Sequence, residues 1–283
     1  MAGRDKEGGR SGEQPYGALA RRLAEKKAIC FDVDGTLTLP LQRASRETVE
    51  LLLDLAEHKE IFILTGNDFA RLDYQVLSEL LRAGGAPYLL NRFHVTLLSG
   101  AERCCFRDGR WKVTEADHID EADRKMIVSV VEDATGRVDG IPMPRVEDRM
   151  AQITFLACGA GATQEERDWD LNGTRRETMA AYIRKRLEEV LPDKRFNVKV
   201  GGPISIDVTL EGVDKASALM KLSDVTGIDI SDIAFIGDGL FPGGNDEVVL
   251  KAGLELGKDA IRVNGPEETN ALIKAMIKEC ERG

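Results

Sequence analysis

Two aspartates separated by one residue, Asp32 and Asp34, follow a short apolar run and precede Gly35. An apolar run of this length predicts a buried parallel strand, and open α/β sheets bind ligands where such strands end. Two neighbouring carboxylates repel each other unless a cation or a proton lies between them. The pattern therefore predicts a metal site, with Mg²⁺ as the ion. An exposed Asp-Gly turn is the alternative for this stretch taken alone.

The two acids can share the work of phosphoryl transfer. Asp32 would attack the phosphorus atom as the nucleophile, and Asp34 would carry a proton to and from the leaving oxygen. Mg²⁺, bound by the Asp32 side chain and the Asp34 backbone carbonyl, would neutralise charge on the phosphate. This chemistry needs further groups from later in the chain.

The next apolar run, residues 61–64, leads into Thr65, Gly66 and Asn67. The Thr65 hydroxyl and the backbone N–H groups of Gly66 and Asn67 could donate hydrogen bonds to a phosphate. In a simpler interpretation, Asn67 or Asp68 only caps the helix predicted at 69–83. Both interpretations can hold together.

Three further charged groups come later, each near the end of an apolar run or at the start of a helix. Lys215 opens a predicted helix, from which its ammonium could reach a phosphoryl oxygen and Asp32. Asp238 ends a buried strand in the same way as Asp32 and could reach the same metal. The Gly-rich stretch 241–246 offers Asn245 to the phosphate or substrate and Asp246 to Lys215 or to the waters of the metal.

The elements that must position these groups alternate between strand and helix. Strands are predicted at 28–31, 61–64, 88–90, 204–209, 233–237 and 260–263, and helices at 46–59, 69–83, 215–226 and 266–280. From 99 to 202 the pattern changes to short strands at 103–106, 152–158 and 196–200 mixed with helices at 121–135 and 174–190. This predicts a Rossmann-like α/β core with a parallel sheet, interrupted by an α+β insertion.

The resulting domain prediction has three parts. Residues 1–15 form a disordered tail, residues 16–98 and 203–283 form the catalytic core, and residues 99–202 form a cap. The chain of 283 residues is long enough for this arrangement.

Composition limits the partners. The net charge of -10 argues against nucleic acids and anionic membranes as main partners. The chain contains no long apolar run and no apolar signal core, which predicts a soluble, cytoplasmic protein. Its five cysteines form no Cys-x-x-Cys motif, so we expect reduced thiols.

In this order the motifs resemble the haloacid dehalogenase superfamily, and within it the type IIB branch, which carries a type C2 cap between the second and third motifs. Four segments are similar to eukaryotic-type phosphomannomutases: 32–40, 201–208, 211–215 and 242–246. The resemblance implies an aspartyl-phosphate on Asp32, Mg²⁺ as the cofactor and a small-molecule phosphate ester as the substrate. It is also the sole basis for expecting a homodimer.

The cap departs from the mutase pattern. Leu41 stands where the family has Arg, residues 147–150 read Glu-Asp-Arg-Met in place of Arg-Asn-Gly-Met, and residues 158–162 replace a Gly-Arg-Ser segment. Each charged donor to a second phosphate is worth about 1.5–3 kcal/mol, and hydrolysis needs no second phosphate site. The remaining arginines that could substitute are Arg145, Arg149, Arg167, Arg175 and Arg176.

These departures favour a Mg²⁺-dependent phosphohydrolase of a sugar phosphate, in which Arg149 binds substrate. The alternative is a phosphomannomutase that interconverts mannose 1-phosphate and mannose 6-phosphate. A third hypothesis, a non-catalytic phosphate-binding protein on the same fold, would normally lack a nucleophile or metal ligand, whereas Asp32, Asp34, Lys215 and Asp238 are all present.

Overall fold

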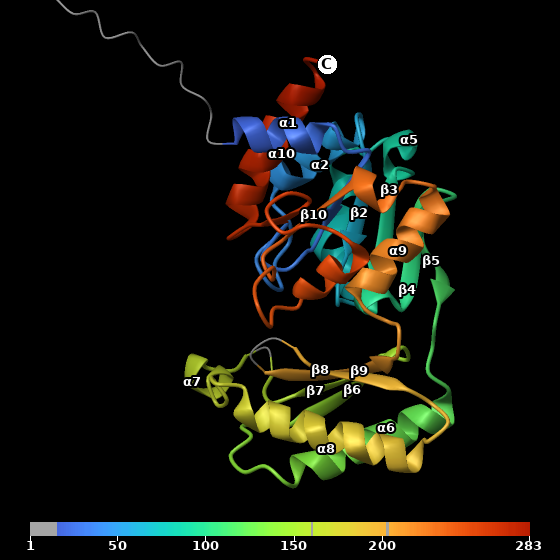
Figure 1. The fold of residues 1–283 in the computed structure, drawn as a ribbon, viewed down its shortest axis with the longest axis vertical. Helices are drawn as coiled ribbons and strands as arrows, with labels where there is room; N and C mark the ends of the chain where they lie inside the picture. Colours follow the sequence, from blue (N-terminus) through green and yellow to red (C-terminus); the bar gives the residue numbers. More distant parts are fainter. Residues whose placement is uncertain (1–15, 160, 202–203) are drawn as a thin grey trace, which may run out of the picture.

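A computed structural model describes residues 16–159, 161–201 and 204–283. The predicted tail, residues 1–15, and parts of two compared motifs, at residues 160 and 202–203, lie outside the described residues. Two β-sheets organise the rest, and they lie one above the other in Figure 1.

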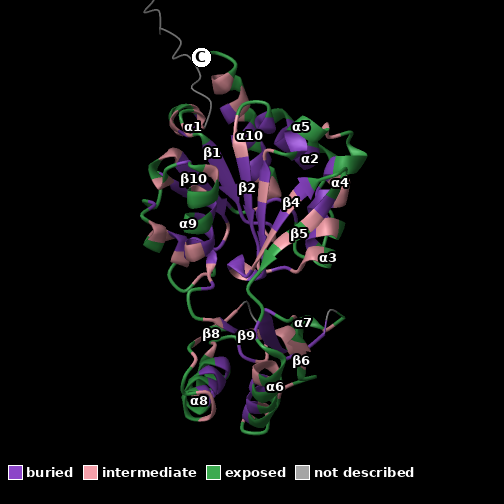
Figure 2. Cartoon of the chain, turned by 90° about the vertical axis from the view of Figure 1, so that its right-hand side faces the viewer, coloured by how far each residue is buried: buried purple, intermediate pink, exposed green. Residues whose placement is uncertain are grey.

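The larger sheet has seven strands in the order β11-β10-β1-β2-β3-β4-β5. Neighbours from β11 to β3 are parallel, and β4 and β5 are antiparallel. The bounds are β1 Ala28–Phe31, β2 Glu60–Leu64, β3 Phe93–Leu97, β4 Glu102–Arg107, β5 Arg110–Ala116, β10 Ile233–Gly237 and β11 Ala260–Arg262. Figure 2 shows buried residues gathered along these strands.

Helices cover both faces of this sheet, which is why its central strands are continuous apolar runs. Ile29 and Phe31 of β1 pack in one cluster, together with α1 (Gly17–Ala24), α2 (Arg46–Ala56) and α10 (Pro266–Cys280). Ala28 and Cys30 pack in another, with α9 (Lys215–Thr226). Shorter helical segments complete the connections: α3 Phe69–Leu72, η1 Asp73–Leu77, α4 Ser78–Arg82, α5 Pro87–Leu90, η2 Leu98–Gly100, η3 Ile230–Asp232 and η4 Glu247–Ala252.

The smaller sheet is antiparallel, with four strands in the order β6-β7-β9-β8. Its elements are β6 Arg145–Asp148, β7 Gln152–Leu156, β8 Phe196–Val200, β9 Ser205–Leu210, α6 Glu121–Thr135, α7 Gln164–Arg167 and α8 Thr174–Val190. The helices α6 and α8 lie on the side of this sheet away from the larger sheet (Figure 1). Ile206 and Val208 of β9 are buried in the cluster that these helices complete. The alternate residue Asp207 is on the opposite face, toward the larger sheet.

The structure corrects three sequence-based placements. The hairpin β4–β5, expected in the insertion, pairs with the edge of β3, and its Phe106 and Trp111 join the larger core. Strand β9, expected in the parallel core, pairs with β7 and β8. Residues 88–90 belong to helix α5, in which Pro87 occupies the first turn, and the predicted strand is β3 instead. Periodicity predicts a strand but does not say which sheet it joins.

The division into a core of residues 16–98 and 203–283 and a cap of residues 99–202 is therefore carried forward as a proposal, with β4–β5 moved to the core and β9 to the cap. We use "cap" below for the smaller sheet with its helices α6, α7 and α8. Within the described residues, no helix combines the length and apolar character needed to cross a bilayer.

Candidate active site

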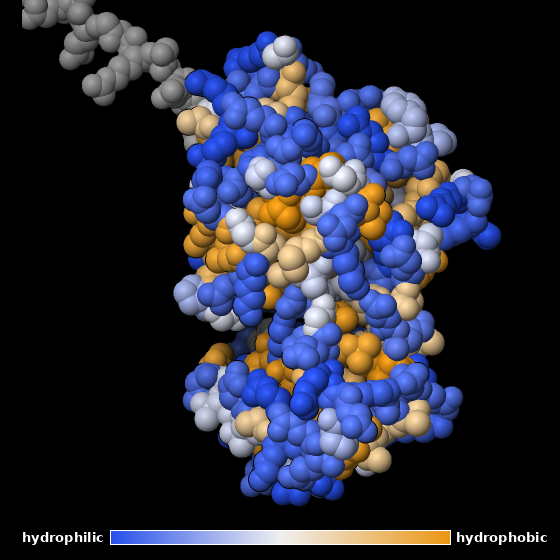
Figure 3. Space-filling view, turned by 45° about the vertical axis from the view of Figure 1, so that its right-hand side comes forward, coloured by the Kyte–Doolittle hydropathy of each residue, from blue (hydrophilic) through white to orange (hydrophobic). Residues whose placement is uncertain are grey.

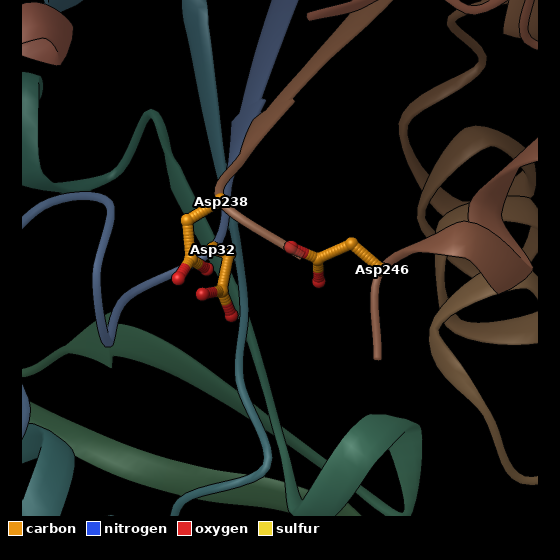
Figure 4. A group of neighbouring side chains, drawn as sticks. All are labelled: Asp32, Asp238 and Asp246. Atoms are coloured by element: carbon orange, nitrogen blue, oxygen red, sulfur yellow. The ribbon is translucent and has the colours of Figure 1, made fainter. Parts of the chain in front are cut away.

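Three carboxylates meet beyond the carboxyl ends of neighbouring strands. Asp32 follows β1, Asp238 follows β10, and these strands are parallel partners, so their ends coincide. Asp246 precedes η4 and points toward the other two (Figure 4). One oxygen from each side chain lies within 4.8 Å of the others. This is the arrangement expected of a cation site built from hard oxygen ligands.

Lys215 bridges two of these acids. It is the first residue of α9, whose N-cap Asp214 forms a reciprocal capping box with Ser217. Its Nζ lies 2.5 Å from Asp32 Oδ1 and 2.5 Å from Asp246 Oδ1. Asp246 Oδ2 accepts a further hydrogen bond, 3.0 Å long, from the backbone N–H of Gly239. Oδ1 of Asp246 thus holds the lysine beside Asp32, while the bond to Oδ2 fixes the Asp246 carboxylate itself.

Burial dominates the electrostatics of this cluster. It raises the pKa of Asp32 to about 7, against the lowering effect of the Lys215 ammonium, while the charge of Asp246 adds to the rise. The pKa of Asp238 is also raised, by burial and then by Asp246. Burial alone would lower the pKa of Lys215, but the two carboxylates outweigh burial and raise it. One ammonium thus faces three acids, an excess of negative charge that a divalent cation would relieve.

Gly35 makes room for one of the ligands. Its φ of +81° is in the left-handed region, and a Cβ built on it would lie 2.3 Å from Asp238 Oδ2. Only glycine accommodates both conditions without strain. The residues present therefore fit a bound metal, with Asp32 and Asp238 as side-chain ligands.

The second aspartate of the first motif has a separate set of partners. Asp34 Oδ1 accepts hydrogen bonds from Gln75 Nε2 at 2.8 Å and from the backbone N–H of Leu41 at 3.3 Å. Asp34 Oδ2 accepts one from Asn67 Nδ2 at 2.8 Å. Asp34 is half-buried, and three neighbouring residues hold its carboxyl group.

The segment after β2 is more internally bonded than the sequence predicted. Thr65 is buried, and its Oγ1 accepts the backbone N–H of Asn67 at 3.1 Å, so this N–H does not point to a phosphate. The Asn67 side chain is engaged with Asp34 and Gln75. Asp68 is the cap of α3, as the simpler interpretation predicted. Gly66 lines the cavity described next.

A cavity of about 800 Å³ lies between the core site and the cap. Figure 3 shows the surface hollowed between the two parts. From the core it is lined by Gly66, Lys215 and Asn245, among others. The glycine at position 239 leaves room for the Asn245 side chain, because a Cβ built on Gly239 would lie only 2.0 Å from Asn245 Oδ1. The cap contributes the core-facing side of its sheet, including Gln152 and Asp207. The volume is in the range of pockets that hold small molecules.

Sequence reasoning missed the polar cluster of the cap sheet. Asp207 Oδ1 accepts hydrogen bonds from Gln152 Nε2 and Thr154 Oγ1, both 2.8 Å long. Burial raises the pKa of Asp207, and the bond from Thr154 opposes the rise. Gln152 Oε1 is buried without a partner among the described residues. The alternation of β9 could have revealed Asp207, because its neighbours Ile206 and Val208 are apolar.

The cap arginines singled out from the sequence have protein partners. Arg149 donates to Glu147 Oε2 through Nη2 at 2.5 Å, and Arg145 pairs with the same acid at 3.0 Å. Arg175 donates to the Trp169 carbonyl at 3.1 Å and its guanidinium lies 5.6 Å from the indole centroid. Arg167 Nε donates to the Ala162 carbonyl. None of these four is among the described residues that line the cavity.

Arg176 is a buried structural group. Its Nε lies 3.0 Å from Asp170 Oδ2, and the exposed fractions of the two side chains are 6% and 1%. It also donates to the carbonyls of Gly201, at 3.1 Å, and Asp170, at 3.2 Å. Arg176 therefore ties the start of α8 to the segment that enters β9.

Two other cap cations line the cavity: Arg184 of α8 and Lys199 of β8. Arg184 donates to the Val198 carbonyl from Nε and Nη2, and Lys199 lies 3.5 Å from Asp214 Oδ2. Arg184 is one of several basic residues on α8, and nothing in their spacing distinguishes it. The sequence indicated only weakly that Lys199 faces away from the cap core, because it alternates with the apolar Val198, which is buried, on the edge strand β8.

Comparison with known proteins decides the family. The family model described as eukaryotic phosphomannomutase matches residues 49–279. The chain belongs to this family. The curated phosphomannomutase of Galdieria sulphuraria is 29% identical over 261 residues, which are 89% of this chain and 92% of that protein. The phosphomannomutase of Arabidopsis thaliana is 26% identical over 87% of this chain and 95% of its own length.

Solved structures support the fold of this phosphomannomutase-family member. An N-terminally truncated, IMP-bound IMP-nucleotidase of Plasmodium falciparum superposes with a TM-score of 0.69 at 17% identity, covering 92% of this chain and 71% of that one. A trehalose-6-phosphate phosphatase of Aspergillus fumigatus gives 0.56 at 18% identity, covering 92% and 96%. At these identities the likeness shows the fold alone. It confirms the predicted haloacid dehalogenase fold, a Rossmann-like core with a cap.

Proposed function

We propose that this protein transfers the phosphoryl group of a sugar phosphate through Asp32, as a phosphomannomutase. The observation that carries the proposal is the placement of Asp32: a buried carboxylate at a strand end, held at 2.5 Å by the ammonium of Lys215, which itself lines the cavity below the cap. Family membership favours a sugar hydroxyl over water as the acceptor. That preference reverses the expectation of a phosphohydrolase drawn from the cap sequence.

The residues divide the chemistry as follows. An Asp32 oxygen attacks phosphorus while the bond from phosphorus to the sugar oxygen breaks, and Asp34 protonates that oxygen. In the second half, Asp34 takes the proton from the acceptor hydroxyl, whose oxygen attacks the phospho-Asp32 and restores the carboxylate. Lys215 stabilises the negative charge in both halves, because Asp246 fixes its ammonium beside Asp32.

A divalent cation, with Mg²⁺ proposed, would be held by Asp32, Asp238 and the Asp34 carbonyl, and it would neutralise charge on the phosphoryl oxygens. Asp246 acts on Lys215 in this scheme. Thr65, Gly66 and Asn245 remain proposed phosphate or substrate contacts. A cytoplasmic location and a homodimer are parts of the same proposal, and they rest on composition and on the family resemblance.

A mutase must also hold the second phosphate of a sugar bisphosphate. Arg149 is engaged with Glu147 and lies outside the cavity lining, so we assign this task to the cavity cations Arg184 and Lys199. Both line the cavity, Lys199 from the edge strand β8 and Arg184 from α8 beside it, and we infer that the sugar places its distal phosphate there. Their guanidinium and ammonium groups suit phosphate oxygens.

Hydrolysis is the second candidate, and a specific observation favours it. Leu41 supplies no cation at the position where the family has arginine, and its side chain is exposed. Without that donor, water competes more easily with a sugar for the phospho-Asp32.

The test measures phosphate migration and phosphate release together. Mannose 1-phosphate and Mg²⁺ are given to the wild type, to Asp32→Asn and to Asp54→Asn, with and without glucose 1,6-bisphosphate, and followed by ³¹P NMR. Asp54 is an exposed residue of α2, so it controls for the same chemical change elsewhere. Formation of mannose 6-phosphate that needs the bisphosphate and is lost only in Asp32→Asn supports the mutase. Release of inorganic phosphate without the bisphosphate supports the hydrolase, and the absence of both overturns the proposal.

A further inference from the structure

Gln75 is a fully buried amide with an acid as its partner. Its exposed fraction is 0%, and its Nε2 donates to Asp34 Oδ1 at 2.8 Å. Its Oε1 accepts Asn67 Nδ2 at 2.8 Å, and the same Nδ2 donates to Asp34 Oδ2 at 2.8 Å. Asp34, Gln75 and Asn67 thus form a closed ring of hydrogen bonds. Both polar ends of the buried amide are satisfied within this ring, as burial requires.

A local irregularity of the helix delivers Gln75 to this ring. Residues Asp73–Leu77 form the π-helical turn η1 between α3 and α4. The wider turn buries three consecutive side chains, those of Gln75, Val76 and Leu77. The Gln75 carbonyl accepts the backbone N–H of Ala44 at 2.8 Å, which fixes the turn against the loop after the first motif. Single π-helical turns are rare and occur mostly at functional sites.

The hydrogen bonds distinguish the two oxygens of Asp34. A carboxylate offers about two acceptor positions on each oxygen. Oδ1 uses both, for Gln75 and for the backbone N–H of Leu41. Oδ2 uses one, for Asn67. The position left open is therefore on Oδ2.

We propose that Gln75 is a positioning residue for the proton transfer, acting through Asp34. By occupying Oδ1, it fixes the rotamer of the carboxyl group and leaves Oδ2 as the oxygen that gives the proton to the leaving sugar oxygen and takes it back from the acceptor. The inference rests on the proposed function, in which Asp34 exchanges that proton. It assigns Gln75 no contact with substrate.

The test exploits the dependence of proton transfer on the leaving group. Release of 4-nitrophenolate needs no proton, whereas release of a sugar oxygen does. In Gln75→Leu, kcat for a hexose phosphate should fall about 100-fold, the lower range of what general acid catalysis contributes, with KM little changed. With 4-nitrophenyl phosphate, the rate of the first turnover, followed as the burst of 4-nitrophenolate, should fall less than about threefold, because this half of the reaction needs no proton donor. Both substrates report on one preparation, so partial misfolding cancels in the ratio.

A double variant completes the test. In an Asp34→Ala background, Gln75→Leu should cause no further fall with the hexose phosphate, since the group that it positions is gone. Equal losses with both substrates, or a further fall in the double variant, would show a merely structural role for Gln75 and overturn the inference alone. A wild type that transfers phosphate from neither substrate would overturn the proposed function and this inference together.

Discussion

Arg176 offers the sharpest test of how the cap is held together. Replacing it with methionine removes a guanidinium from Asp170 and from the carbonyls of Gly201 and Asp170, while the length of the side chain is nearly kept. If Arg176 were a phosphate donor, as its sequence position allowed, the change would affect substrate binding. The structure predicts a loss of stability instead.

The magnitude follows from burial. Removing one partner of a buried ion pair typically costs about 3–5 kcal/mol, because the other charge is left without compensation. Asp170 keeps two backbone donors, the N–H groups of residues 175 and 176, at 3.0 and 2.9 Å. We therefore expect the lower value, about 3 kcal/mol. With a urea m-value of about 2–3 kcal/mol/M, the unfolding midpoint would move down by about 1–1.5 M.

The assay is urea unfolding followed by tryptophan fluorescence, since Trp169 precedes Asp170 and reports on the cap. Arg175→Met is the matched control on the same helix turn. Its guanidinium is exposed over Trp169, so the change should cost about 1 kcal/mol or less. Equal midpoint shifts for Arg176→Met and Arg175→Met would refute the reasoning, as would an Arg176→Met shift below about 0.3 M.

Two other predictions concern single groups. Burial alone would raise the pKa of Asp170, but bonds from the backbone and side chain of Arg176 outweigh it and lower the pKa below 3.8. The stability that ionised Asp170 contributes is thus full above about pH 4 and is lost below it, so the stability gap between wild type and Asp170→Asn should narrow in acid urea titrations. Gly35→Ala should weaken Mg²⁺ binding at least tenfold by calorimetry, because its Cβ meets Asp238 Oδ2. Gly84→Ala is the control, because Gly84 has a similar φ of +83° but open space around it. This variant should bear a similar backbone strain and bind Mg²⁺ normally. Equal Mg²⁺ binding by both variants would contradict the argument.

The sequence was sufficient for the parts of the site that lie at strand ends. Asp32 and Asp238 each end an apolar run, and parallel strands bring such ends together without any knowledge of the loops. Lys215 followed from its position at the start of a helix. For these residues, their positions at strand ends and at a helix start were enough to predict that they lie close together.

Other parts depended on contacts that periodicity does not encode. Gln75 occurs within a helical pattern and would pass for a surface residue, because the π-helical turn that buries it has no sequence signature that we could apply. Which sheet the hairpin β4–β5 joins is decided by the free edge of β3 and by the packing of Trp111 against Phe93 and Phe106. The preference for hydrolysis came from missing arginines. The spacing of basic residues on α8 did not indicate that Arg184 lines the cavity, and the alternation of β8 indicated Lys199 only weakly.

The continuity of β9 with α9 has a consequence for how this protein could diverge or be redesigned. Asp207 on the cap wall and Lys215 beside Asp32 belong to one short stretch, and the turn between them is braced by the bonds of Val213 with Leu210 and Thr209. A residue of the cavity wall and the proposed catalytic lysine are thus encoded by one continuous segment. A recombinant that exchanges caps but keeps β9 together with its own α9 transfers Asp207 and Lys215 as one block. A crossover within residues 210–214 would instead have to rebuild the turn that positions the lysine.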